Sequence, residues 1–292
     1  MNPVIKTCLN VPLMIFLLVI TSHAITGCTC GSNNQAQTLY DISYGADPRN
    51  RVDISLPAGR TLKTPVIILL HGGAWISGDK SDYNFLREYF SLRGFAVVSV
   101  NYRLARVTGK GFDDILEDIS KVLILVTENS GSWVYSKDLV FIAGHSAGGH
   151  MALLYSFTRD PEGLIRGVVS FCGVTDLTDP DLKRAFDRMQ IDDLKPGGRP
   201  FDLLEFMTGG SNEIKKVYSP LYVTGRVPVL LFTGKKDAIV PWQQSAALHN
   251  KMISEGFDST LYIYPDMGHD ITINYKKIMT VTEKWVRSRS GE

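Results

Sequence analysis

The sequence Gly144-His145-Ser146-Ala147-Gly148 follows the apolar run at residues 139–143 and precedes a helical stretch. A strand, a G-x-S-x-G turn and a helix in this order place a serine on a tight turn, where small neighbours let the chain pass close to itself. A serine presented in this way can act as a nucleophile. The pentapeptide alone is a weak signal because 26 of the 292 residues are glycine, so the surrounding sequence decides its meaning.

Short apolar runs and longer amphipathic stretches alternate on both sides of this turn. Residues 39–44 and 51–56 alternate polar and apolar side chains around a turn rich in Gly, Asp, Pro and Asn, which predicts an antiparallel edge hairpin. Continuous apolar runs, typical of strands buried on both faces, occupy residues 66–70, 96–100, 139–143, 168–172, 229–232 and 261–264. Helical periodicity is present at residues 82–92, 113–128, 147–158, 243–255 and 271–287. The sequence therefore predicts an α/β fold, with a mostly parallel central sheet and helices on both faces.

Residues 173–222 interrupt this alternation. They contain four prolines and two glycine pairs among helical fragments, and they are longer than an ordinary connection between a helix and a strand. We expect a small, cap-like insertion over the carboxyl edge of the sheet, within a single domain that spans residues 39–292. An insertion at this edge can form the wall of a pocket.

A second glycine-rich loop, His71-Gly72-Gly73-Ala74-Trp75, follows the apolar run at residues 66–70. Backbone N–H groups in this loop and in the residue after the serine can converge on one oxygen, where they stabilise the negative charge of a tetrahedral intermediate. We therefore predict an oxyanion hole formed by the N–H groups of Gly73, Ala74 and Ala147, beside the candidate nucleophile Ser146.

At these motifs the chain resembles the α/β-hydrolase superfamily and, within it, the hormone-sensitive-lipase-like group and the bacterial feruloyl- and acetyl-esterases. Residues 71–75, the segment Asn-Tyr-Arg-Leu-Ala at 101–105 and the turn at 144–148 occur at the spacing of that group. The similarity extends from about residue 39 to the C-terminus and implies an α/β-hydrolase fold. The family usually has a third glycine where Ala74 stands. The alanine side chain narrows the loop, but the oxyanion donor at this position is the backbone N–H, which alanine retains.

A serine nucleophile needs a base to remove its proton, and the base needs an orienting carboxylate. Hydrolases of this fold supply these groups in the order Ser, acid, His. The last histidine of the chain, His269, lies in the loop after the run at residues 261–264 and is the expected base. The resemblance assigns the acid to Asp237, which follows the run at residues 229–232. Asp176, after the preceding strand, is the alternative.

The reaction predicted from these residues is the hydrolysis of a carboxylic ester through an acyl-enzyme. Ser146 attacks the carbonyl, His269 moves the proton and Asp237 holds the imidazole, so that no metal and no organic cofactor is required. One modest insertion and no long apolar lid favour short-chain, carbohydrate or aryl esters. Trp75 and Tyr83 are candidates for the alcohol side of the site, with packing in the core as the alternative.

Three other functions remain open at this point. The same motifs resemble those of the arylformamidases, which hydrolyse the amide N-formylkynurenine. A serine peptidase of this fold would normally bring a further domain and a site for the N-terminus of its substrate. A non-catalytic binding module would be expected to have lost a member of the triad, whereas all three are present. His150, one turn beyond Ser146, is interpreted as a buried packing residue rather than a base.

The N-terminal residues have a composition of their own. An uninterrupted apolar run at residues 11–20 follows Lys6; it is shorter than the roughly 20 residues of a membrane span and typical of a secretory signal. The sequence Ile25-Thr26-Gly27-Cys28 resembles the bacterial lipobox, in which the cysteine is lipidated and the chain is cut before it. We expect a signal peptide at residues 1–27, a lipid on Cys28, a flexible tether at 28–38 and an exported protein anchored to a bacterial membrane. A plain secretory signal or a marginal anchor helix is the alternative.

The overall composition excludes several classes of protein. The chain is 44% hydrophobic and 21% charged, with 31 basic and 30 acidic side chains, which is typical of a globular protein. Cleavage before Cys28 would remove Lys6 and leave equal numbers of basic and acidic groups, so that nothing favours binding to nucleic acid. A small ester is the expected partner. Cys30 and Cys172 are not expected to form a structural disulfide.

Overall fold

A computed structural model describes residues 34–105, 111–160, 162–188 and 202–291. The predicted signal peptide at residues 1–27, the lipidation site Cys28 and the first part of the predicted tether lie outside these residues. Within the described ranges, no helix is both long enough and apolar enough to cross a membrane.

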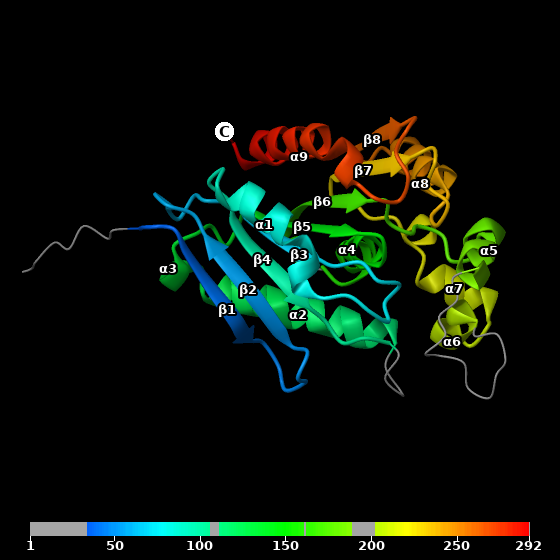
Figure 1. Cartoon of the computed structure of the whole chain (residues 1–292), viewed down its shortest axis with the longest axis horizontal. Helices are drawn as coiled ribbons and strands as arrows, with labels where there is room; N and C mark the ends of the chain where they lie inside the picture. The colour runs from blue at the N-terminus through cyan, green and yellow to red at the C-terminus, as the bar shows by residue number, and fades with distance from the viewer. Residues whose placement is uncertain (1–33, 106–110, 161, 189–201, 292) are drawn as a thin grey trace, which may run out of the picture. The chain divides into compact units, whose positions relative to one another are not determined.

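In the part of the chain that the structure describes, the centre of the fold is an eight-stranded sheet with the strand order β1-β2-β4-β3-β5-β6-β7-β8 (Figure 1). The pairs β1–β2 and β2–β4 are antiparallel, and every other pair is parallel. A mostly parallel sheet that begins with an antiparallel edge hairpin confirms the fold expected from the sequence. The strands are β1 (Gln37–Ser43), β2 (Arg51–Leu56), β3 (Val66–Leu70), β4 (Ala96–Asn101), β5 (Val140–His145), β6 (Ile165–Phe171), β7 (Val229–Gly234) and β8 (Ser259–Tyr264).

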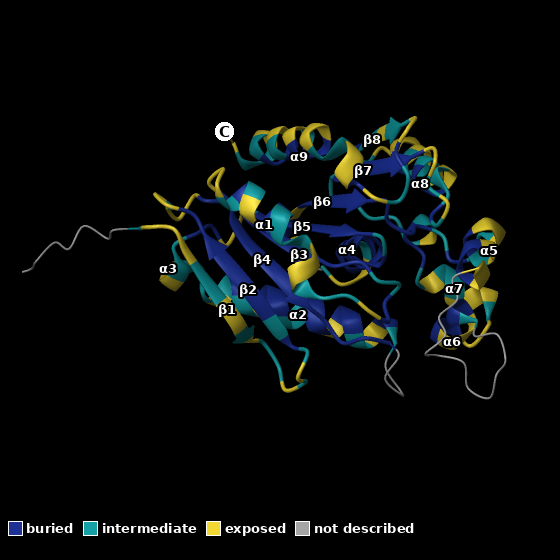
Figure 2. Ribbon diagram, viewed as in Figure 1, coloured by how far each residue is buried: buried dark blue, intermediate teal, exposed yellow. Residues whose placement is uncertain are grey.

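Helices cover both faces of this sheet, which explains why the central strands are apolar throughout. In β3, Ile67 and Leu69 pack with α1 (Asn84–Ser91) and α9 (Tyr275–Ser290), whereas the alternate residues of the strand pack on the opposite face. The central strands are accordingly buried, whereas the edge strands and the outer surfaces of the helices are partly exposed (Figure 2). The helices of the opposite face are α2 (Phe112–Glu128), α4 (Ala147–Thr158) and α8 (Trp242–Ser254), and the short elements η1 (Lys80–Tyr83) and α3 (Ser130–Trp133) lie in the connections.

The interval between β6 and β7 contains short helices, and residues 189–201 within it lie outside the described ranges. In Figure 1 these helices lie beyond the arrowheads of β5 and β6, at the carboxyl edge of the sheet. The helices are α5 (Pro180–Arg188), α6 (Leu203–Thr208), α7 (Asn212–Val217) and η4 (Pro220–Tyr222). The side chains of Asp202 and Ser211 accept hydrogen bonds from backbone N–H groups and thereby cap the N-termini of α6 and α7.

Two boundaries differ from the expectation in ways that matter for the site. The first strand begins at Gln37, so Gln37 and Thr38 belong to the sheet rather than to the tether; they pair with Leu56 and Ser55 of β2. The strand β5 continues to His145 instead of ending at residue 143. Because backbone pairing with β6 continues through this segment, His145 is held by the sheet and not by a loose turn.

Candidate active site

Ser146 lies at the junction of β5 and α4. Its φ of 54° and ψ of −118° are outside the conformations that a residue with a Cβ normally adopts. A Cβ on Gly144 would overlap the backbone of Gly148, and a Cβ on Gly148 would overlap the carbonyl of Leu70. The two glycines therefore permit the close turn that holds Ser146 at the carboxyl edge of the sheet.

His269 and Asp237 are joined by a hydrogen bond between the loops that follow β8 and β7. Nδ1 of His269 lies 2.8 Å from Oδ2 of Asp237, whose side chain has no solvent exposure. The other carboxylate oxygen accepts the backbone N–H groups of Ile239 at 2.9 Å and Val240 at 2.8 Å. An ionised carboxylate can only accept, so Nδ1 carries the proton and Nε2 is the nitrogen available as a base.

The alternative acid, Asp176, bonds elsewhere. Its Oδ1 accepts the backbone N–H of Thr178 at 2.8 Å and the hydroxyl of the same residue at 2.6 Å, and its Oδ2 lies 3.4 Å from the hydroxyl of Tyr222. Both oxygens are thus used within the segment that follows β6. The geometry therefore favours Asp237 over Asp176 as the partner of His269.

The structure brings His269 to the turn that carries Ser146. Nε2 of His145, the residue before the serine, lies 2.8 Å from the backbone oxygen of His269, and the two imidazole rings are 4.7 Å apart. In the described part of the chain, no hydrogen bond joins Oγ of Ser146 to His269. Contacts of this kind often tighten only when substrate is bound.

The loop after β3 presents the N–H groups expected to bind an oxyanion. Gly73, Ala74 and Trp75 all have positive φ, of 109°, 49° and 62°. This backbone conformation is strained for Ala74 and Trp75 because they carry a Cβ. Ala74 thus adopts the left-handed conformation that the usual third glycine would adopt without strain. Ala147 is the first residue of α4, and the N–H of a first helical residue has no acceptor within its helix.

A residue that the sequence analysis missed holds this loop. Arg49, in the β1–β2 turn, donates from Nη2 to Nε2 of His71 at 3.2 Å, to the oxygen of Gly78 at 2.9 Å and to Asn101 at 3.1 Å, and from Nε to the oxygen of Tyr102 at 3.0 Å. Because an arginine can only donate, Nε2 of His71 is the acceptor. No local pattern around Arg49 indicates this role, which depends on contacts with distant segments.

His150 and Trp75 belong to the core. Nε1 of Trp75 donates to Nδ1 of His150 at 3.1 Å, and Nε2 of His150 lies 2.7 Å from the backbone oxygen of Tyr218. Both side chains are fully buried, and burial lowers the pKa of His150 to about 4. The interpretation of His150 as a packing residue is confirmed. Trp75 packs rather than lining an open site, so its candidacy for the alcohol side is wrong.

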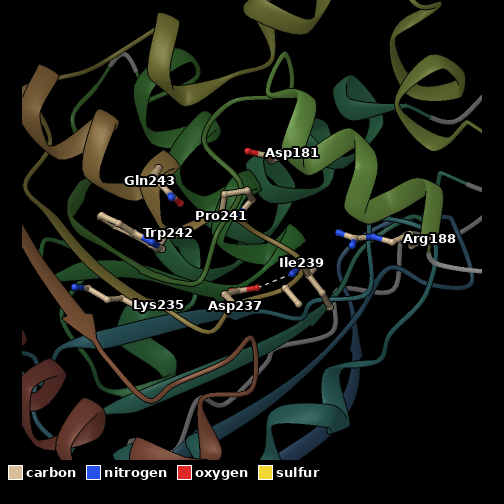
Figure 3. Close-up of a pocket in the computed structure, with 9 residues that line it drawn as sticks. Asp181, Arg188, Lys235, Asp237, Ile239, Pro241, Trp242 and Gln243 are labelled. Carbon is tan, nitrogen blue, oxygen red and sulfur yellow. Dashed lines mark hydrogen bonds between the residues drawn. The ribbon is translucent and has the colours of Figure 1, made fainter.

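Two cavities flank the His269–Asp237 pair. One of about 210 Å³ is lined by Tyr83, Phe85 and His145 together with Asp82 and the segment 270–272. The other, of about 250 Å³, lies between α5 and the loop that carries Asp237 (Figure 3). Its walls include Trp242, Lys235 and Arg188. Tyr83 thus contacts an open cavity, as its candidacy for the alcohol side of the site requires.

A cluster of potential metal ligands also lies here: His145, Cys172 and His269 place ligand atoms within 4.8 Å of one another. Both ring nitrogens of His145 already have hydrogen-bond partners, Tyr83 at 2.6 Å and the His269 oxygen at 2.8 Å. Burial raises the pKa of the Cys172 thiol, which disfavours the thiolate that binds metals. These contacts favour a hydrogen-bonded network over a metal centre.

The chain is similar in sequence to known hydrolases. It is 25% identical over 246 residues to the probable isoprenylcysteine alpha-carbonyl methylesterase ICMEL1 of Oryza sativa subsp. japonica, a match that covers 80% of this chain and 57% of the rice protein. It is 30% identical over 165 residues to the kynurenine formamidase of Danio rerio, which covers 54% of each protein. The chain thus spans a little more than half the length of these curated relatives.

Comparisons of structure and of family agree with the fold described above. The crystal structure of esterase B from Lactobacillus rhamnosis superposes with a TM-score of 0.72 at 20% identity, covering 89% of this chain and 87% of that chain. The predicted α/β-hydrolase fold is therefore confirmed. The BD-FAE family model matches residues 52–252, a span that includes Ser146, Asp237 and the loop at residues 71–75. Since this match covers more than half of the chain, the protein belongs to the BD-FAE family.

Proposed function

We propose that this protein is a serine carboxylic-ester hydrolase that acts through Ser146, His269 and Asp237. The observation that carries the proposal is the meeting of two features at one edge of the sheet. Ser146 stands in a strained turn between β5 and α4, and His269, held by Asp237 at 2.8 Å, reaches that turn through the contact of its backbone with His145. Acyl transfer requires a nucleophile, a base beside it and an acid that orients the base.

In the acylation step, Ser146 Oγ attacks the ester carbonyl while Nε2 of His269 takes the hydroxyl proton. Oδ2 of Asp237 keeps the proton on Nδ1 and stabilises the imidazolium. The N–H groups of Gly73, Ala74 and Ala147 bind the oxyanion of the tetrahedral intermediate. When the intermediate collapses, His269 returns the proton to the departing alcohol and an acyl-serine remains. Water, activated by the same imidazole, then releases the acid.

Short-chain, carbohydrate and aryl esters are the substrates that we propose. The two cavities beside the His269–Asp237 pair, of about 210 and 250 Å³, suit small groups better than long acyl chains. Trp242 lines the larger one, and an indole face is a surface on which an aromatic ring or a sugar can pack. The similarity to a methylesterase also supports an ester with a small leaving group.

Labelling with a fluorophosphonate tests the proposed chemistry directly. The wild-type protein should be labelled, and peptide mapping should place the adduct on Ser146. Ser146→Ala should lose both the label and the turnover of p-nitrophenyl acetate while keeping its thermal unfolding profile. Turnover retained in that variant would refute the assignment. Acetylated xylo-oligosaccharides, methyl ferulate and p-nitrophenyl esters of increasing length would then define the substrate class.

The second candidate function is the hydrolysis of an arylformamide. It is favoured by the 30% identity with a kynurenine formamidase over 165 residues, and it would use the same nucleophile and base because a formamide carbonyl is attacked in the same way. N-formylkynurenine belongs in the substrate panel for this reason. A kcat/KM for this amide above that of every ester would make the formamidase the better assignment.

We also propose that the protein is exported and held at a bacterial membrane by a lipid on Cys28. The support is in the sequence: an apolar run at residues 11–20, followed by Ile25-Thr26-Gly27-Cys28. Two or more acyl chains would give lasting attachment. Metabolic labelling with palmitate should mark the wild-type protein and leave Cys28→Ser unlabelled; equal labelling of the two would contradict lipidation at this residue.

A further inference from the structure

The residue between Gly144 and the candidate nucleophile has a polar contact on each side of its ring. Nδ1 of His145 lies 2.6 Å from the hydroxyl of Tyr83, and Nε2 lies 2.8 Å from the backbone oxygen of His269, which is 124 residues away in the sequence. The ring itself is tilted against the imidazole of His269, with the ring centroids 4.7 Å apart. His145 therefore connects the turn of the nucleophile with the loop of the base.

The chemistry of the partners determines the direction of both hydrogen bonds. A carbonyl oxygen can only accept, so Nε2 of His145 must carry a proton. Burial, reinforced by the neighbouring His269, lowers the pKa of His145 to about 4, so the ring is neutral at pH 7 and Nδ1 has a free lone pair. Burial raises the pKa of the Tyr83 hydroxyl, which therefore keeps its proton and donates. The chain runs from Tyr83 O–H to Nδ1, and from Nε2–H to the carbonyl of His269.

The loop that receives this hydrogen bond is anchored in the core on both sides of His269, whereas His269 itself is only half-buried. Met267 and Ile271 are buried in the core, and the backbone N–H of Lys236 donates to the oxygen of Met267 at 3.0 Å. Between them, the side chain of His269 is held by Asp237 at 2.8 Å and its main chain by His145. Two tethers thus fix the position of the base: the loop after β7 holds its ring, and the end of β5 holds its backbone.

We propose that His145 is a positioning residue that holds the backbone of His269, and with it the catalytic imidazole, in register with Ser146, and that Tyr83 keeps His145 in the tautomer this requires. The inference rests on the proposed function, because it assumes that His269 is the base. The strand supports the arrangement: His145 is the last residue of β5, where its backbone pairs with Phe171 of β6. A side chain fixed in this way can transmit the geometry of the sheet to the loop.

The decisive comparison is between two substitutions at residue 145. His145→Phe keeps a ring of similar size but removes the N–H donor, whereas His145→Gln offers an amide N–H to the carbonyl and an amide oxygen to Tyr83. A misplacement of the base by about 1 Å can lower the rate about 100-fold. We therefore expect His145→Phe to lower kcat for p-nitrophenyl acetate by roughly that factor with little change in KM, and His145→Gln to recover most of it.

Control variants separate this effect from a general loss of structure. His249→Phe removes a half-buried histidine that contacts Ser259 at 2.9 Å, away from the site, and should keep the wild-type kcat. If His145→Phe does not fold, Tyr83→Phe takes its place, with Tyr135→Phe as its match, because Tyr135 is buried and donates to Val126 at 2.8 Å. Tyr83→Phe should lower kcat about 5-fold, the factor equivalent to one hydrogen bond of about 1 kcal/mol; Tyr135→Phe should not.

Three results would overturn the proposal: a wild-type kcat in His145→Phe, an equal loss of kcat in His145→Phe and His145→Gln, or equal effects of the two tyrosine variants. Nitrogen NMR of labelled histidine gives a reading that does not depend on activity. The resonances that disappear in His145→Gln should show a protonated Nε2 and an unprotonated Nδ1, and the opposite tautomer would contradict the hydrogen-bond chain. If the wild-type protein neither turns over esters nor labels at Ser146, the proposed function fails, whereas the tautomer measurement still tests the contact.

Discussion

Nδ1 of His269 and Oδ2 of Asp237 form a 2.8 Å hydrogen bond across 32 residues of sequence, and the carboxylate that accepts it is completely shielded from solvent. The second oxygen of the carboxylate is occupied by two backbone N–H groups. A carboxylate held in this way by several donors keeps its orientation. The pair is therefore built to fix one tautomer of the imidazole.

Replacement of Asp237 by Asn should have a large effect on the rate. An amide can present its N–H to His269 and favour the wrong tautomer, and loss of the orienting carboxylate in such triads lowers kcat about 10⁴-fold. Steady-state hydrolysis of p-nitrophenyl acetate measures this change. Asp176→Asn is the matched control and should remain within a few-fold of the wild type. The reverse ranking would show that Asp176 is the acid.

Replacement of Arg49 by Ala should slow catalysis without touching a reacting group. It removes the donors to His71 and to three oxygens around the loop at residues 71–78. The proposed oxyanion donors then lose their rigid support, and we expect kcat to fall about 10-fold or more. Arg51→Ala, in the adjacent strand, removes bonds to Ser43 and Asn50 only and should keep the wild-type kcat. Equal activities of the two variants would refute the support role of Arg49.

Replacement of Gly148 by Ala should destabilise the fold. The added Cβ would overlap the backbone carbonyl of Leu70, which cannot move without disturbing β3, so we expect a loss of about 3 kcal/mol in the free energy of unfolding. Gly131→Ala, where a Cβ meets no atom within 4 Å, should stabilise α3 or leave it unchanged. Urea denaturation of both variants measures the difference, and a similar stability of the two would contradict the tight turn.

Three buried histidines should make the protein less stable in acid. Burial lowers the pKa of His71, His145 and His150 to about 4 each, from about 6.5 in an unfolded chain. Between these values the unfolded state binds more protons, so the free energy of unfolding falls as the pH decreases from about 6.5 to 4. Urea denaturation at several pH values should show this slope, and His150→Leu should reduce it. An identical slope in the variant would contradict the contribution of His150.

Replacement of Trp242 by Ala should change specificity rather than chemistry. The indole lines the cavity behind Asp237 (Figure 3), and loss of a stacking surface weakens the binding of an aromatic or sugar group by about 1 kcal/mol. We expect a KM about 5-fold higher for methyl ferulate or acetylated xylo-oligosaccharides and an unchanged KM for methyl acetate, which has neither an aromatic nor a sugar group. The same shift in KM for all substrates would show that this cavity does not select them.

The sequence alone predicts the central sheet and the helix after the candidate nucleophile because these features depend on local patterns. Hydrophobic periodicity places β2 at residues 51–56, β3 at 66–70 and α4 at 147–158, as the structure has them. The glycines around Ser146 indicate the sharp turn because only a residue without a Cβ fits there. The order of the motifs also leads to Ser146 and His269 as candidate nucleophile and base.

Contacts between distant segments required the tertiary structure. Asp237 and Asp176 both follow strands of the same sheet, and only the packing of the loops shows which of them reaches His269. Trp75 is adjacent to the predicted oxyanion-binding residues in sequence, yet the helices over the sheet enclose it completely. Arg49 and His145 acquire their roles from partners far along the chain. Periodicity reports the environment within one segment, whereas a hydrogen bond between two segments depends on how the whole sheet brings them together.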